Sequence, residues 1–302
     1  MAGRILSTAH GTHRGSFAAV DWLLFAAVGT IWGSSFLFMA IGLEAFRPGL
    51  VTWLRILFGA ALLWMLPGVR TRIERADLVP LLILAVAWVA IPFTLFPLAQ
   101  GSVNSAIAGM LNGAAPIFTV VIATILFRRA PGSRQLLGIP IGFLGVAAIA
   151  MSAAGEGRSQ MVGVVLILVA TVCYGIAFNV ATPLQQKYGS LPVMARILAT
   201  GAVLTAPFGL GSLPGSRFAW FALLAVAAVG LLGTGIAFVL MGRLVGRVGA
   251  TRASIVGYLI PVVALLLGVL LRNDEVEPIA VVGVALVVVG AYLTSRRETA
   301  EV

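Results

Sequence analysis

The sequence predicts an all-α integral membrane protein with ten transmembrane helices, built from two five-helix repeats of opposite orientation. Three observations predict this fold. Of the 302 residues, 60% are hydrophobic and only 10% are charged. A soluble chain carries about 25% charged residues, so a soluble fold is excluded. The chain also divides into apolar runs of membrane-spanning length, and its two halves share motifs in the same order.

The apolar runs are expected to be helices, because about 20 residues cross the bilayer and every backbone polar group must find a partner within its own segment. Residues 78–127 carry no charge over twice the length of one span, and the polar segment 101–105 divides them into two spans. The loops are too short for a soluble domain. The other predicted spans are residues 22–43, 48–67, 135–153, 162–182, 192–210, 218–241, 250–271 and 278–295.

These spans define the expected organisation of the chain. Residues 1–19 are an N-terminal tail, 20–153 the first repeat, 154–161 a linker, 162–296 the second repeat and 297–302 a C-terminal tail. The tail does not resemble a cleaved signal peptide, because the first apolar run is longer than the hydrophobic region of such a peptide.

Basic residues predict the orientation, since cytoplasmic loops are enriched in Lys and Arg. With the N-terminus placed in the cytoplasm, fourteen of the 20 Lys and Arg fall in inner segments and four in outer loops. Both termini are therefore expected to be cytoplasmic. The same count explains the net charge of +10 without nucleic acid as a partner. The four outer residues are Arg47, Arg158, Arg217 and Arg272.

The two halves match at offsets of 141 to 145 residues. Because five spans is an odd number, the second half must enter the membrane from the opposite side. Inverted repeats of this kind are common in secondary transporters, where the substrate binds near the midplane between the halves. The matching pairs are Trp32-Gly33-Ser-Ser-Phe36 with Tyr174-Gly175-Ile-Ala-Phe178, Arg55-Ile-Leu with Arg196-Ile-Leu, Pro116 with Pro261, and Gly138 and Gly145 with Gly283 and Gly290.

In this order the motifs resemble those of EamA-type transporters, in the drug/metabolite transporter superfamily, over about residues 20–296. The resemblance implies ten helices in two repeats, and it is strongest to the family's bacterial exporters of aromatic and other neutral amino acids. The family often has Gly-Glu before its fifth and tenth helices, where this chain has Arg129 and Asp274 or Glu275. The motifs are Ile31-Trp32-Gly33-Ser34-Ser35-Phe36, Arg55, Ser105-Ala-Ile-Ala-Gly, Pro116, Ala253-Ser254, Tyr258-Leu259-Ile260-Pro261-Val262-Val263-Ala264 and Gly283 to Gly290.

The predicted centre carries no charge, although ionisable residues at mid-depth usually mark ion coupling or a charged substrate. Arg55 and Arg196 are the only charges within spans. Each is expected either to snorkel to the interface or to pin or gate helices. Without a central acid, a proton relay of Asp or Glu and a pump for organic cations are disfavoured. A neutral or zwitterionic solute fits better. The acids nearest the spans, all at span ends, are Asp21, Asp77, Asp274, Glu275 and Glu277.

Eleven aromatic, amide, hydroxyl and thioether residues are the candidate substrate-binding residues, and all except Asn104 of the polar segment 101–105 lie at mid-depth. Aromatic faces suit apolar side chains and ammonium groups, and amides and hydroxyls suit an amino-acid backbone. Packing against lipid or another helix, or interhelical hydrogen bonding, is the alternative for each. The candidates are Trp32, Phe36, Met39, Trp88, Asn104, Asn112, Tyr174, Phe178, Asn179, Thr234 and Tyr258.

The sequence therefore predicts a secondary transporter that exports small neutral or zwitterionic metabolites, in particular amino acids of the aromatic, methionine and threonine types. The alternatives are a multidrug or other metabolite carrier of the same family, a membrane-embedded enzyme, or a channel. An enzyme is disfavoured because no His lies in a span and Cys173 has no base beside it. No catalytic group, metal or cofactor is predicted. The expected partners are a small-molecule substrate and the bilayer, in a monomer or weak homodimer.

Overall fold

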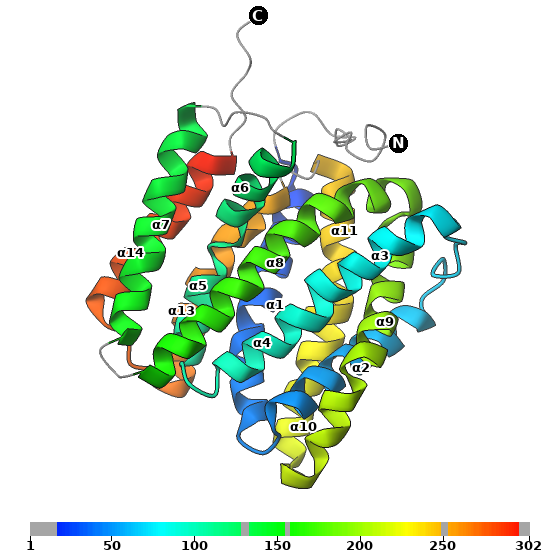
Figure 1. Cartoon of the computed structure of the whole chain (residues 1–302), viewed down its shortest axis with the longest axis horizontal. Helices are drawn as coiled ribbons and strands as arrows, with labels where there is room; N and C mark the ends of the chain where they lie inside the picture. Colours follow the sequence, from blue (N-terminus) through cyan, green and yellow to red (C-terminus); the bar gives the residue numbers. More distant parts are fainter. Residues whose placement is uncertain (1–16, 128–132, 155–157, 249–252, 296–302) are drawn as a thin grey trace, which may run out of the picture.

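The computed structural model describes residues 17–127, 133–154, 158–248 and 253–295, which are helical with short connections and contain no β-strand. Figure 1 shows α1 beginning and α14 ending on the same, upper side of the bundle. The first half contains α1 Ala19–Leu43, α2 Pro48–Met65, η2 Arg75–Asp77, α3 Leu78–Leu84, η3 Ala85–Ala90, α4 Ile91–Ala99, α5 Ser105–Asn112, α6 Ala115–Phe127 and α7 Ser133–Ala154. The second contains α8 Arg158–Tyr188, α9 Ser190–Gly211, η4 Leu213–Gly215, α10 Trp220–Ala228, η5 Val229–Ile236, α11 Ala237–Val248, η6 Ser254–Tyr258, α13 Leu259–Arg272 and α14 Pro278–Ser295.

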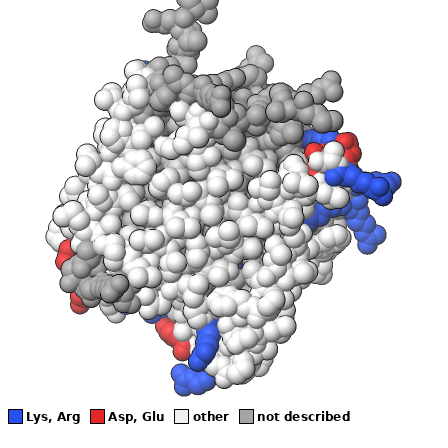
Figure 2. Space-filling view, in the orientation of Figure 1, with Lys and Arg blue, Asp and Glu red and all other residues white. Residues whose placement is uncertain are grey.

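The surface is that of a protein solvated by lipid. Figure 2 shows charged side chains at the upper right and along the lower edge, with a broad uncharged face between them. Large apolar side chains point outward, for example Val203 at 73% and Leu224 at 64% exposed. In water this much exposed apolar surface would drive association. In a bilayer it is the surface that acyl chains cover.

Within the described residues, seven helices are long and apolar enough to cross a membrane. They are Ala19–Leu43, Pro48–Met65, Arg75–Ala99, Ser105–Ile125, Gln160–Ala181, Ser190–Gly211 and Trp220–Leu244. Three shorter apolar helices, Leu136–Ser152, Val256–Arg272 and Pro278–Leu293, lie at the remaining predicted spans. The count of ten spans and their inverted arrangement stay predictions.

Two of the long helical rods, Arg75–Ala99 and Trp220–Leu244, are each interrupted by a π-helical turn. Such turns frequently occur at functional sites. In the first, η3 precedes Pro92, which has no N–H for the Trp88 carbonyl four residues earlier. In the second, η5 joins α10 to α11. Farther along the first rod, Pro97 leaves the Phe93 carbonyl without its intrahelical donor, and the Thr52 hydroxyl donates to that oxygen at 2.8 Å. The irregular backbone is thus satisfied from a neighbouring helix.

A broken helix in each half meets its counterpart near the centre. α5 ends at Asn112 and α6 begins at Ala115, because Pro116 cannot donate to the Asn112 carbonyl. A Cβ on Gly113 would lie 2.7 Å from Cγ of Pro261, and one on Gly257 would lie 3.1 Å from Cγ of Pro116. Each proline ring therefore lies against the glycine of the other break.

The glycine faces of α7 and α14 pack against each other within the chain, where they lie side by side at the left of Figure 1. A Cβ on Gly145 would lie 2.6 Å from the carbonyl oxygen of Gly283, and one on Gly283 would lie 2.8 Å from that of Gly145. Small residues permit this close backbone approach. These faces are therefore occupied by an intramolecular contact.

The two ends of α1 are both fastened to the second half. At its start, the Asp21 carboxylate accepts from Arg247 Nε of α11 at 2.5 Å. Just beyond its end, the Glu44 carboxylate accepts from Arg272 Nη1 of α13 at 2.6 Å. The centre of the bundle lies between these two contacts.

Candidate functional site

Seven aromatic side chains form a continuous series of six ring contacts in the middle of the bundle, and we refer to them as the aromatic collar. The series starts at Trp32 on α1 and ends at Phe36, one helical turn later on the same helix. Both halves contribute rings. The contacts are Trp32–Phe238 at 5.7 Å, Phe238–Trp88 at 5.4 Å, Trp88–Phe178 at 5.0 Å, Phe178–Tyr174 at 6.4 Å, Tyr174–Phe96 at 5.9 Å and Phe96–Phe36 at 5.4 Å between centroids.

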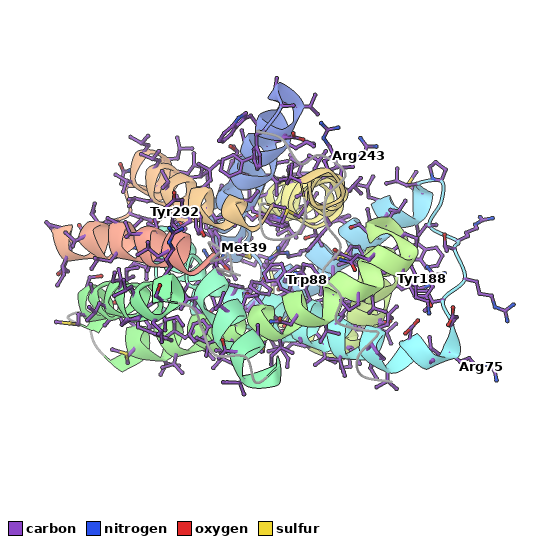
Figure 3. All side chains as sticks on the ribbon, turned by 90° about the horizontal axis from the view of Figure 1, so that it is seen from above. Met39, Arg75, Trp88, Tyr188, Arg243 and Tyr292 are labelled. Atoms are coloured by element: carbon purple, nitrogen blue, oxygen red, sulfur yellow. The ribbon has the colours of Figure 1, made fainter. Side chains whose placement is uncertain are left out.

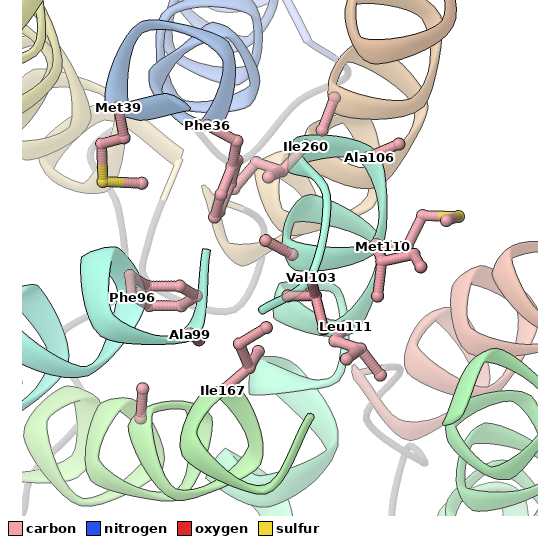
Figure 4. Packing of buried hydrophobic residues seen from close by; sticks show 14 of the residues in the cluster. Phe36, Met39, Phe96, Ala99, Val103, Ala106, Met110, Leu111, Ile167 and Ile260 are labelled. Carbon is pink, nitrogen blue, oxygen red and sulfur yellow. The ribbon is translucent and has the colours of Figure 1, made fainter. Parts of the chain in front are cut away.

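The collar lies at the meeting point of the apolar cores. Trp32 packs against all three hydrophobic clusters of the described chain, and Tyr174 packs against two. Both side chains are only half-buried in spite of this position. Figure 3, viewed from above, places Trp88 and Met39 near the middle of the molecule and Tyr188 and Arg75 toward its edge. Figure 4 shows Phe36 and Phe96 on facing helices, α1 and α4.

The π-turn η5 supplies the polar partner of the collar. The Trp32 indole N–H donates to the Gly233 carbonyl at 3.0 Å, and the Thr234 hydroxyl lies 3.1 Å from the Val229 carbonyl. The hydrogen bond from Trp32 to Gly233 connects α1 to the second half of the chain.

Arg55 is the buried charge beside the collar. Its side chain is 6% exposed. Nε donates to the Thr234 hydroxyl at 3.1 Å, Nη1 lies 3.2 Å from Sδ of Met39, and Cζ lies 3.7 Å from the centroid of the Phe93 ring. Helices α1, α2 and α4 and the turn η5 therefore meet at one guanidinium.

The expectation that Arg55 snorkels to the interface is wrong, and so is the expectation of an uncharged centre. Arg55 is the eighth residue of the 18-residue helix α2, about 10 Å along the axis from its start. Its helix face points toward Met39 and Thr234, away from lipid.

Arg196, the matched residue of the second half, behaves differently. Its Nη1 donates to the carbonyls of Val69 at 2.9 Å and Pro192 at 3.0 Å, and Nη2 donates to that of Thr71 at 2.6 Å. Arg196 thus fastens the connection that follows α2, which is the pinning alternative.

The structure brings together seven of the eleven predicted site residues. Five are in the collar, and two more, Met39 and Thr234, are held to it through Arg55. Prediction from sequence missed Arg55, Phe96 and Phe238. A signal for Phe238 existed, because the tetrapeptide Gly-Ile-Ala-Phe occurs both at 175–178 and at 235–238. The five collar members predicted from sequence are Trp32, Phe36, Trp88, Tyr174 and Phe178.

Three predicted residues satisfy backbone groups elsewhere. Asn104 caps α5, accepting from the Ile107 N–H at 2.8 Å and donating to the Glu275 carbonyl at 3.0 Å. Asn179 donates to the carbonyls of Thr119 at 3.1 Å and Gly175 at 2.8 Å. The Tyr258 hydroxyl donates to the Ala291 carbonyl at 2.5 Å, and its ring packs on Tyr292 of α14.

Asn112 is different, because its buried amide oxygen has no donor among the described residues. Its side chain is 9% exposed and lies at the break between α5 and α6. A buried acceptor without a donor costs about 1–3 kcal/mol. The unpaired amide oxygen of Asn112 therefore destabilises the fold, and it can accept a hydrogen bond from a ligand.

A crevice of about 390 Å³ lies outside the centre, where the start of α2 approaches α9. It is lined by Arg47, Pro48, Gly49, Leu98, Pro207, Phe208, Gly211 and Ser212. None of the collar residues borders it.

Comparison with known proteins gives a consistent result. The model of the EamA-like transporter family matches residues 21–151 and 161–296. The chain is 28% identical to the "Probable terminal-alkyne amino-acid exporter" of Streptantibioticus cattleyicolor, over 91% of this chain and 93% of that protein. It is also 28% identical to the "Uncharacterized inner membrane transporter YedA" of Escherichia coli K12, over 87% and 89%. A crystal structure with a TM-score of 0.63 and 18% identity, covering 92% of this chain and 96% of that one, shares the fold.

Proposed function

The chain belongs to the EamA-like transporter family, and we propose that it is a secondary transporter that exports small neutral or zwitterionic metabolites. As a member of this family it is a multi-pass membrane transporter and not an enzyme, and it works on small molecules within a lipid bilayer. The substrates we assign are amino acids of the aromatic, methionine and threonine types. The transport mode we assign is alternating access.

The aromatic collar is the observation that carries this assignment. Rings from α1, η3, α4, α8 and α11 meet in it, so both halves contribute to one site. Aromatic faces can hold an apolar side chain and attract an ammonium group. The half-buried faces of Trp32 and Tyr174 are the surfaces that a solute would contact.

In the mechanism we propose, an inverted repeat of ten spans provides alternating access to the collar. Several features support it: the reciprocal contacts of Pro116 and Pro261, π-turns at corresponding places in the two halves, and a family model that matches twice. The packing of α1 on α13 also has a counterpart in that of α8 on α6. Two halves of similar shape and opposite orientation can exchange conformations, which moves the opening from one face to the other.

The contacts at the two ends of α1 are the places where such openings would form. Asp21–Arg247 closes one side of the bundle and Glu44–Arg272 the other. In the cycle we propose, one contact separates while the other persists. The positive-inside rule puts Asp21, both termini and Arg247 on the cytoplasmic side.

The oligomeric state we assign is a monomer or weak homodimer in the bacterial inner membrane. The glycine faces that could support tight dimerisation are occupied by the α7–α14 contact. The relative from S. cattleyicolor, named an amino-acid exporter, supports the substrate class.

Counterflow in proteoliposomes tests the function. Vesicles containing purified protein are loaded with unlabelled L-phenylalanine, L-methionine or L-threonine, and uptake of the labelled solute is followed. A carrier gives a transient accumulation above protein-free vesicles, which a channel does not give. Absence of flux above protein-free vesicles for every neutral amino acid would refute the substrate assignment.

A further inference from the structure

Arg55 has more hydrogen-bonding capacity than its neighbours use. A guanidinium offers five N–H donors. Here one is used on the Thr234 hydroxyl and one on the weakly accepting sulfur of Met39. The remaining donors have no acceptor within the described part of the chain, and no carboxylate in that part forms an ion pair with Arg55.

A cation buried in this way is expensive. Removing an ion from water costs several kcal/mol even after the protein relaxes, and charges inside membrane spans are nearly always paired or functional. The Phe93 ring recovers part of this cost by cation–π attraction. The Arg55 guanidinium therefore still lacks a negatively charged partner among the described residues.

Arg196 shows what a purely structural arginine looks like in this chain. Its guanidinium makes three hydrogen bonds, all to backbone carbonyl oxygens. The Arg55 guanidinium donates to no backbone carbonyl in the part of the chain that the structure describes. Its neighbours are a hydroxyl, a thioether and an aromatic face, which stabilise a cation weakly and leave it able to bind an anion.

The surroundings also fit an anionic ligand. Tyr174 of the collar carries a hydroxyl and lies near Arg55, so its ring and the guanidinium face the same part of the bundle centre. A carboxylate could accept from two guanidinium nitrogens at once, the geometry in which arginine binds it best. The solute's apolar part would then lie against the collar.

We infer that Arg55 binds the carboxylate of the transported solute, so that transport requires a carboxylate. This inference rests on the proposed export of amino acids, and it adds the group that recognises them. It replaces recognition of the amino-acid backbone by neutral amides and hydroxyls with recognition by a fixed positive charge. Amides and amines of the same shape would leave the guanidinium unpaired and are rejected.

The first test compares solutes on the unmodified protein. Counterflow is measured for L-phenylalanine and for L-phenylalaninamide, which keeps the ring and the amino group but has no carboxylate. The expected result is at least a tenfold faster exchange of the acid. Equal exchange of acid and amide would overturn the inference while leaving the transport function intact.

The second test removes the charge. Arg55→Gln should reduce exchange of L-phenylalanine at least tenfold and leave the slow exchange of the amide unchanged, and Arg55→Lys should restore part of the selectivity. Arg196→Gln, at the matched position, should keep the ratio of acid to amide. A fall in both substrates to the same degree in Arg55→Gln would mean that Arg55 is only structural.

A binding measurement separates this inference from the transport function. The midpoint of thermal unfolding is measured in detergent with L-phenylalanine, 3-phenylpropionate or L-phenylalaninamide. Both carboxylates should raise it and the amide should not. If no solute is transported but the carboxylates stabilise the protein, the proposed function fails and the Arg55 site stands. If neither carboxylate stabilises it more than the amide, the site fails.

Discussion

The ring of Pro261 lies so close to Gly113 that a Cβ there would be 2.7 Å from Cγ of the proline. The converse contact joins Pro116 to Gly257. The breaks in α5–α6 and η6–α13 are therefore not independent kinks. They form one interface between the halves, and its close fit depends on glycine.

Gly113→Ala is expected to destabilise the protein by about 1–3 kcal/mol, because the added methyl group would collide with Pro261 and with the Met110 carbonyl. Thermal unfolding in detergent measures the effect. Gly211→Ala is the control, because that site has nothing within 4 Å. Equal unfolding midpoints for the two variants would contradict the close fit.

Trp32→Ala is expected to lower L-phenylalanine exchange about tenfold or more while the protein stays folded, because it opens the collar and removes the bond to Gly233. Trp220→Ala removes an indole that is 70% exposed on the outer surface and should leave exchange unchanged. If both variants exchange at the wild-type rate, the collar does not form the transport path.

Asn112 and Asn179 should respond in opposite ways. Asn112→Leu removes an unsatisfied amide oxygen, so its unfolding midpoint should stay the same or rise while exchange falls. Asn179→Leu removes hydrogen bonds to Thr119 and Gly175 and should cost about 1 kcal/mol of stability. A strongly destabilised Asn112→Leu with normal exchange would assign Asn112 to packing alone.

The ion pair at the end of α8 predicts a pH dependence. Hydrogen bonds to Asp77 and Glu74 raise the pKa of the Lys187 ammonium. A raised pKa means that the stabilisation is complete below the ordinary lysine pKa of about 10.4 and is lost as the pH rises above it. The difference in unfolding midpoint between wild type and Lys187→Met should therefore be constant from about pH 7 to 9 and shrink above about pH 10.5. A difference that already falls near neutral pH would point to another titrating group.

The helix positions could be predicted from the sequence because the bilayer imposes them. Apolar runs such as 48–67 and 278–295 coincide with α2 and α14 to within two residues. Pro92 and Pro116 stand at irregular turns, where they remove backbone donors, but the π-turn η5 contains no proline and had no such signal.

The direction in which each side chain points was much harder to predict. A helix that is apolar all round gives no signal for its buried face, so Phe96 was not among the predicted site residues, and Arg55 was expected either to snorkel or to pin or gate helices. The repeat motif compensated for this at Trp32 and Tyr174, and both side chains lie in the collar. Asn104 and Tyr258 gave a polar signal for a different reason, since a helix start and a neighbouring helix need partners there.

The inverted arrangement of the two halves is tested most directly by the sidedness of Glu44 and Gln186, which are matched by the repeat and are both exposed. Each is replaced by cysteine in a Cys173→Ala background, and intact cells are treated with a membrane-impermeant maleimide. We predict that Glu44→Cys is labelled at once and Gln186→Cys only after the membrane is permeabilised. Labelling of both cysteines from the same side would contradict the inverted repeat and the alternating access built on it.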